Sequence, residues 1–209
     1  MSDTIPPDLE RWETRFAAEA YVFGTAPNDF LAREAHRLSP GAKVLAVADG
    51  EGRNGVFLAE QGMDVLSLDF SPQARAKAER LARARGVTLQ CETADLRHWA
   101  WPEAAFDAVV AIFIQFATPE FRPRLFAHML AALKPGGLLF LEGYRTEQLA
   151  YNTGGPSDIA HLYSEALLRD AFAGADILLL ESEDRDLHEG QGHHGRSALI
   201  DLIARRKPG

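Results

Sequence analysis

Three glycines that follow the apolar run at 43–48 have the spacing of a nucleotide-binding turn. Gly50, Gly52 and Gly55 match the pattern G-x-G-x-x-G. Glycines at this spacing let the backbone turn tightly beneath a nucleotide, although an ordinary strand-to-helix turn uses flexible residues too. Asp69 favours the nucleotide, because it ends the next apolar run, 19 residues after Gly50. A carboxylate at that place accepts hydrogen bonds from ribose hydroxyls.

The charges of this turn bear on which nucleotide it binds. Asp49 and Glu51 flank Gly50, and two carboxylates would repel the pyrophosphate of a dinucleotide. A ligand with a cationic sulfonium and an amino group tolerates them. Ala48 and Asp49 also separate the strand from the first glycine, which follows the strand more directly in the dinucleotide arrangement. Both observations favour S-adenosylmethionine over NAD as the cofactor.

The segment 186–196 gathers three histidines, two acids and one arginine among glycines. Three interpretations of it remain open. In the first, it is an acceptor-side loop in which His188 is a general base or orients the substrate, and Arg196 binds an anionic substrate. In the second its histidines bind a metal, and in the third it is a solvated hairpin tip. The spacing H-x4-H-H matches no established metal signature, so we expect no metal site.

Strands alternate with helices along the chain, and this alternation would bring such residues to one edge of a sheet. Predicted strands cover residues 43–48, 64–69, 87–92, 106–114, 138–142, 176–182 and 197–204. Predicted helices cover 52–61, 72–85, 118–134 and 164–172, and two more lie within 8–38, on either side of 24–28. The pattern predicts an α/β fold, a Rossmann-like three-layer sandwich around a seven-stranded, mostly parallel sheet. The last two strands have no helix between them and should form a hairpin that adds an antiparallel strand.

Length, composition and net charge indicate a single ordered domain and disfavour a nucleic-acid-binding protein. The 209 residues predict one domain, with an N-terminal helical lid at 1–40 and a Rossmann-like core at 41–209. Hydrophobic residues make up 46% of the chain, which excludes intrinsic disorder. A net charge of -8 disfavours sequence-independent nucleic-acid binding, which neutralises phosphates with basic residues. The basic residues of one predicted helix are interpreted as a solvated face; they are Arg75, Lys77, Arg80, Arg83 and Arg85.

The cysteine content and the absence of long apolar runs indicate where in the cell the protein is expected. Cys91 is the single cysteine, which excludes an intrachain disulfide and a cysteine-cluster metal site, and it is interpreted as a core residue. This fits the cytoplasm. The first eight residues lack the basic and apolar regions of a signal peptide, and no run of about 18 apolar residues occurs. We therefore expect a cytoplasmic protein without a membrane partner.

Together these motifs resemble the class I S-adenosylmethionine-dependent methyltransferases. VLAVADGEGRNGVFLAEQGMDVLSLDFSP at 44–72 resembles the first two motifs of that family. ADL at 94–96, FDAVVAIFIQF at 106–116 and LKPGGLLFLEGY at 133–144 resemble its later motifs. YVFGTAPNDFL and DLHEGQGHHGRSALIDLIARR look similar to the TehB-like, tellurite-resistance subgroup. The resemblance runs from about residue 21 to the end and implies a single methyltransferase domain.

The resemblance implies a role for individual residues. The turn from Ala48 to Gly52 would lie under the methionine and ribose, Asp69 would hold the ribose hydroxyls, and Phe70 would flank the adenine. The implied cofactor-binding residues are Ala48, Asp49, Gly50, Gly52, Asn54, Asp69, Phe70, Asp95, Leu96, Phe113 and Ile114. The position of the ligand crevice, outside the carboxyl ends of the strands, predicts the substrate-side residues Tyr21, Phe23, Gln115, Tyr144 and Arg145, and the segment 186–196 supplies the predicted catalytic residues His188 and Arg196. Tyr21 and Phe23 fit a lid or a packed core equally well.

Three positions depart from the family pattern. Ala46 stands where the family has an acid, Ala48 where it has glycine, and Asp49 where it has a small residue. Asp49 would then take over the amino-group contact that position 46 no longer offers.

We therefore predict methyl transfer from S-adenosylmethionine to a small molecule or an oxyanion, such as a thiol, tellurite or selenite. The expected partner is a small acceptor, with no nucleic acid and no membrane, and the expected state is a monomer or homodimer. An NAD-type oxidoreductase is the alternative, but no Tyr-x3-Lys pair that would handle a hydride is present. A non-catalytic nucleotide-binding domain also remains open.

Overall fold

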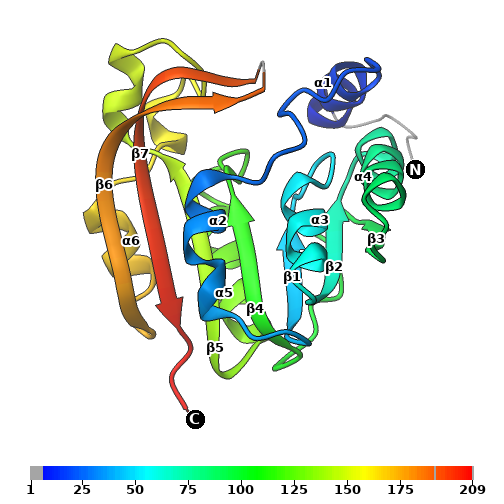
Figure 1. The fold of residues 1–209 in the computed structure, drawn as a ribbon. Coiled ribbons are helices and arrows are strands. Elements are labelled where there is room, and N and C mark those ends of the chain that lie inside the picture. The colour runs from blue at the N-terminus through cyan, green and yellow to red at the C-terminus, as the bar shows by residue number, and fades with distance from the viewer. Residues whose placement is uncertain (1–6, 191, 209) are drawn as a thin grey trace, which may run out of the picture.

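The computed structural model describes residues 7–190 and 192–208. They form one seven-stranded sheet in the order β3-β2-β1-β4-β5-β7-β6 (Figure 1). The strands are β1 Lys43–Val47, β2 Asp64–Asp69, β3 Gln90–Thr93, β4 Phe106–Ile112, β5 Leu133–Tyr144, β6 Asp176–Glu189 and β7 His193–Arg205. Strands β1 to β5 pair in parallel, and β7 runs antiparallel to both β5 and β6. The predicted fold class and the C-terminal hairpin are confirmed.

Helices cover both faces of this sheet. The α-helices are α1 Pro7–Phe16, α2 Asp29–Glu34, α3 Arg53–Glu60, α4 Pro72–Arg85, α5 Arg122–Ala132 and α6 Glu165–Ala171. Short 3-10 turns are η1 Ala35–Arg37, η2 Thr146–Ala150 and η3 Ile159–His161. No helix in the described ranges is long and apolar enough to cross a bilayer.

The alternation of side chains along β1 shows why two layers of helices form. Val44 and Ala46 face a cluster that contains Leu58 of α3 and Phe30 of α2. Leu45, with Val47, faces the opposite cluster, which α5 and α6 fill. Since successive side chains of a strand point to opposite faces, an uninterrupted apolar run is buried on both sides.

Helix α4 begins and ends where its sequence predicts. Ser71 caps its start by accepting a hydrogen bond from the backbone N of Ala74 at 3.0 Å, and Pro72 occupies the first turn. Gly86 ends the helix in the left-handed conformation, with φ of 71°. This short-range chemistry needs no tertiary partner, so the sequence predicts it well.

The last hairpin differs from its prediction. The two strands extend to Glu189 and from His193, so most of the segment 186–196 is paired strand instead of loop. Gln191, at the tip, lies outside the described residues. The strands escape detection because Glu189 and His193, which are buried, are polar. When the inward-facing side chains of a strand are polar, the sequence lacks the alternation of apolar and polar residues that predicts a strand.

The N-terminal region also differs from its prediction as a lid at 1–40. Phe30 and Leu31 of α2 are fully buried against the sheet, so α2 belongs to a core layer. Of the described residues before α2, those at 7–28, the N-terminal cover, lie outside that layer. The hairpin tip contacts this cover: Gly192 N donates to Val22 O at 3.0 Å, and a Cβ on Gly190 would come within 2.5 Å of Gly24 N. The view in Figure 1 shows the β6–β7 hairpin reaching toward α1.

Candidate active site

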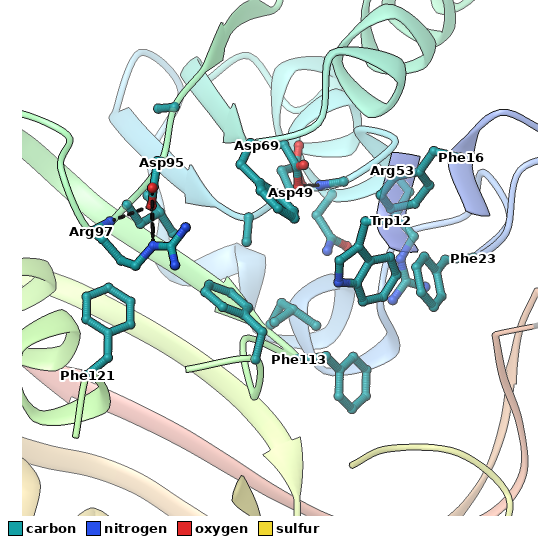
Figure 2. Close-up of a pocket in the computed structure, with 18 of the residues that line it drawn as sticks. Trp12, Phe16, Phe23, Asp49, Arg53, Asp69, Asp95, Arg97, Phe113 and Phe121 are labelled. Atoms are coloured by element: carbon teal, nitrogen blue, oxygen red, sulfur yellow. Dashed lines mark hydrogen bonds and ion pairs between the residues drawn. The ribbon is translucent and has the colours of Figure 1, made fainter. Parts of the chain in front are cut away.

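A cavity of about 290 Å³ opens at the carboxyl ends of the parallel strands, where ligands bind in such sheets. Its lining residues are Trp12, Phe16, Phe23, Ala48, Asp49, Gly50, Arg53, Asn54, Asp69, Phe70, Ala94, Asp95, Leu96, Arg97, Ile112, Phe113, Phe116, Thr118, Phe121 and His193. Figure 2 shows Asp95 and Arg97 at one end, Trp12, Phe16 and Phe23 at the other, and Asp69 between.

The glycine turn forms the floor of this cavity. Gly50 and Gly52 have φ of 60° and 86°, and Ala48 adopts the same left-handed region with φ of 50°. That conformation suits glycine and strains alanine by about 1 kcal/mol. A Cβ on Gly52 would lie 2.5 Å from Cβ of Ala78, so its absence lets α3 approach α4 closely. Gly52 itself does not line the cavity.

Asp69 is held ready to accept hydrogen bonds. Its carboxylate accepts from the backbone N of Gly50 and of Ser71, each at 2.9 Å. Burial raises the pKa of Asp69 to about 6, although these two amides favour the charged form. A fixed, desolvated carboxylate of this kind is a strong acceptor for hydroxyl groups.

Of the two acids of the turn, Asp49 lines the cavity and Glu51 does not. The Asp49 carboxylate accepts from Ser67 Oγ at 2.8 Å and from Gly55 N, and burial raises its pKa to about 7. Glu51 points away from the cavity into an ion pair with Lys77, at 2.5 Å. The electrostatic argument against pyrophosphate therefore fails for Glu51, because its charge is compensated.

Lys77 corrects the interpretation of α4 as a solvated basic face. Its side chain is 3% exposed, and its ammonium donates to Glu51 and to Ala20 O. Glu51 in turn accepts from the backbone N of Val22 at 2.7 Å and of Phe23 at 3.3 Å. This buried pair ties the N-terminal cover to α4.

Asp95 marks the other end of the cavity. Burial would raise its pKa, but hydrogen bonds from Arg97 lower it to about 2. The Arg97 Nε lies 2.9 Å from Asp95 Oδ1. Asp95 is therefore ionised at any ordinary pH, and Leu96 lies beside it on the wall.

Sequence reasoning missed the polar group that lies opposite Asp95. Arg53 Nη2 bonds Glu189 Oε2 at 2.7 Å, while Arg53 Nη1 is buried without a hydrogen-bond partner among the described residues. His193 Nδ1 lies 3.5 Å from the same Glu189 oxygen. Burial would raise the pKa of Glu189, yet His193 and Arg53 lower it to about 2. Glu189 and His193 are paired across the β6–β7 hairpin. That pairing is what would have revealed this group, and it cannot be seen before the hairpin is known.

Most of the implied cofactor residues meet at the cavity. Those that line it are Ala48, Asp49, Gly50, Asn54, Asp69, Phe70, Asp95, Leu96 and Phe113. Asn54 also accepts a hydrogen bond from Asn28 N at 2.9 Å. Ile114 is fully buried in the core behind the wall and does not line the cavity.

Of the predicted substrate-side residues, one lines the cavity and four do not. Phe23 lines the cavity, whereas Tyr21 donates to Lys77 O at 3.1 Å and Gln115 bridges Tyr144 N and O. Tyr144 is buried behind Phe113, and burial raises the pKa of its phenol. Arg145 is paired with Asp184. These four side chains hold the wall in place and do not reach its surface.

The structure does not bring the two predicted catalytic residues to the cavity. His188 is exposed and its ring packs on His194, with centroids 5.3 Å apart. Arg196 is half exposed and lies 3.8 Å from Asp186. In a strand, residues one position apart face opposite sides, so Glu189 faces inward and His188 outward.

Known proteins that are similar to this chain in sequence include methyltransferases, which agrees with the fold. Residues 44–137 match the family described as "Methyltransferase domain". A protein-L-isoaspartate O-methyltransferase of Gloeobacter violaceus is 34% identical over 116 residues, which are 54% of this chain and 53% of that protein. The chain thus spans about half the length of the curated relatives it matches.

Solved structures of other proteins with a similar fold align with nearly the whole of this chain. One, from work on conversion of a disulfide bond into a thioacetal group during echinomycin biosynthesis, has a TM-score of 0.76 at 22% identity and covers 95% of this chain and 91% of its own. TehB from Haemophilus influenzae has a TM-score of 0.71 at 19% identity, covering 95% of this chain and 67% of its own. On these motifs and this match, residues 44–137 belong to the methyltransferase domain family, and the whole chain has the fold of the S-adenosylmethionine-dependent methyltransferases to which it is similar.

Proposed function

We propose that this protein transfers a methyl group from S-adenosylmethionine to a small-molecule acceptor. The observation that carries the proposal is one cavity with a hydroxyl acceptor, Asp69, at its centre and Arg53 on its wall, whose Nη1 is buried without a hydrogen-bond partner among the described residues. An orphaned buried donor requires an acceptor from a ligand or from water. The carboxylate of a bound methionine moiety is such an acceptor.

The remaining wall also fits this cofactor. Asp69 would accept the ribose hydroxyls, Asp95 and Leu96 would border the adenine, and Phe70 offers it a flat apolar surface. The adenine then lies at the Asp95 end, and the methionine lies toward Arg53. When bound, S-adenosylmethionine supplies a methyl group already activated by its sulfonium.

The chain's own residues then align the acceptor and exclude water, which is most of what an in-line displacement requires. Trp12, Phe16 and Phe23 of the N-terminal cover close the cavity over the methionine end. The cover and the core act as one catalytic domain in this proposal. The small volume supports a small acceptor over a macromolecule.

Calorimetry with S-adenosylmethionine, S-adenosylhomocysteine and NADH tests the cofactor. We expect both adenosyl compounds to bind and NADH not to saturate the site. Binding of NADH alone would contradict the methyltransferase proposal, and binding without turnover across a broad acceptor screen would favour a non-catalytic nucleotide-binding domain. The screen measures release of S-adenosylhomocysteine with thiols, phenols, selenite and tellurite.

A further inference from the structure

His193 occupies the wall of the cavity next to the N-terminal cover. It is 8% exposed, and its ring centroid lies 4.1 Å from that of Phe113 and 4.5 Å from that of Phe23. Phe23 lies at the end that Figure 2 shows opposite Asp95. A titratable ring is thus fixed between two aromatic side chains at the end where the methyl group would be delivered.

The charged groups around His193 come from three elements. Glu189 of β6 is 3.5 Å away, Arg53 of α3 pairs with Glu189, and Arg15 of α1 stacks over Phe23 at 5.2 Å. The buried Tyr144 ring lies 5.8 Å from His193. Burial, with Arg53 and Arg15, lowers the pKa of His193 below 6.5, while Glu189 works in the opposite direction. The imidazole is therefore neutral at pH 7.

The position of Glu189 selects a tautomer. His193 Nδ1 is buried and makes no hydrogen bond within the described residues, and the nearest carboxylate oxygen, Glu189 Oε2, lies 3.5 Å away. A proton on Nδ1 is attracted to that carboxylate, which leaves the lone pair on Nε2. A neutral imidazole in that tautomer accepts a proton at Nε2. The buried carboxylate stabilises the imidazolium that results, because opposite charges attract strongly where water is excluded.

The surroundings also indicate what the acceptor is. The end near His193 is walled by Trp12, Phe16, Phe23 and Phe113. The cations of the cavity wall are already engaged: Arg97 pairs with Asp95, and Arg53 pairs with Glu189 and would hold the methionine carboxylate of the cofactor. An aromatic surface favours an apolar ligand. An oxyanion would lose its hydration there for little compensation.

We infer that His193 is the general base for an apolar acceptor whose nucleophile arrives protonated, as a thiol or phenol. This inference rests on the proposed methyl transfer. The acceptor's sulfur or oxygen forms a bond to the methyl carbon as the bond from that carbon to the sulfonium breaks, and the electron pair of the broken bond stays on the donor's sulfur. The S–H or O–H proton passes to Nε2. The products are a neutral thioether or ether, S-adenosylhomocysteine and an imidazolium, which later loses its proton to solvent.

The test compares His193→Gln with His194→Gln, an exposed neighbour on the same strand, in the full chain. Benzyl thiol and 4-methylphenol are protonated at pH 7, whereas a nitro-substituted thiophenol is ionised. We expect His193→Gln to lower kcat by about 100-fold with a protonated acceptor and by less than about 3-fold with the ionised one. His194→Gln should leave both rates unchanged. S-adenosylhomocysteine should bind both variants as it binds the unaltered protein.

The pH profile gives an independent readout. With a protonated acceptor and saturating S-adenosylmethionine, kcat should fall at acidic pH, because His193 then becomes charged, and this limb should vanish in His193→Gln. An equal loss for all acceptors, or an unchanged limb, would overturn the role of His193. Faster turnover of selenite than of either protonated acceptor would overturn the acceptor class. Failure of the unaltered protein to bind S-adenosylhomocysteine would instead sink the proposed function.

Discussion

At the scale of single residues, Asp69 combines two properties that rarely coincide. Two backbone amides fix its carboxylate, yet burial keeps its pKa as high as about 6. A ligand hydroxyl favours the charged carboxylate, because it donates a hydrogen bond to it. Binding and deprotonation of Asp69 are therefore linked.

We predict that affinity for S-adenosylhomocysteine rises with pH up to about 6 and is flat above, since only the ionised carboxylate accepts from both hydroxyls. Asp69→Asn should weaken binding by more than about 10-fold at pH 7.5, a loss of about 1.4 kcal/mol, and should remove the slope near pH 6. Calorimetry between pH 5 and 8 measures both.

Asp95→Asn is the matched control for the pH slope. The pKa of Asp95 is about 2, so this variant should keep the slope near pH 6 whatever it does to affinity. An Asp69→Asn protein with the original affinity and slope would remove Asp69 from the ribose role.

At the scale of elements, the Lys77–Glu51 pair connects α4 to the N-terminal cover. Both side chains are almost fully buried, and Glu51 also accepts from Val22 N. Removing one partner of a buried pair leaves the other charge without compensation, which costs more than the pair's net contribution to stability.

We predict that Lys77→Met lowers the free energy of unfolding by about 3 kcal/mol, measured by urea denaturation. Arg75→Met should cost less than about 0.5 kcal/mol, because Arg75 forms an exposed pair with Glu79 one turn away on the same helix. An equal decrease in the free energy of unfolding in the two variants would show that the buried Lys77–Glu51 pair contributes no more to stability than an exposed pair does.

The elements also show what the sequence can predict and where it fails. Strand β1, helix α4 and the place of Asp69 follow from local apolar runs and capping residues. The partners of Lys77 and His193 do not, because each depends on a contact with an element distant in the chain. A polar side chain that is buried by such a contact looks the same in the sequence as a solvated one.

At the scale of the whole molecule, two of the 30 acidic residues lie fully buried inside the described part of the fold. Glu142 and Asp201 are fully buried on adjacent strands and share Arg185, at 2.5 and 2.9 Å. Asn28 also donates to Glu142, at 2.6 Å, and Arg33 lies 3.2 Å from Asp201. Burial raises the pKa of both carboxyl groups, so their charged forms depend on these cations.

We predict that Arg185→Met destabilises the fold by about 3 kcal/mol at pH 8 and by less at pH 5. The sign follows from the raised pKa values: the folded state binds protons that the unfolded state releases, so stability is lost as pH rises. Urea unfolding at both pH values measures the difference. An effect that is larger at pH 5 would contradict this account.

The contact between Gly24 and Gly190 has a kinetic consequence. These residues are 166 positions apart in the chain, so their contact closes a long loop at an entropic cost that other contacts must offset. The junction consists of one backbone hydrogen bond, the close approach of Gly24 to Gly190 and the packing of Phe23 on His193, and we expect it to open by local unfolding while the core stays folded. Hydrogen exchange at the amides of Val22 and Gly192 should then be faster than in β4 and should slow once an adenosyl ligand is bound. The opening rate of this junction would then limit how fast ligands enter the site.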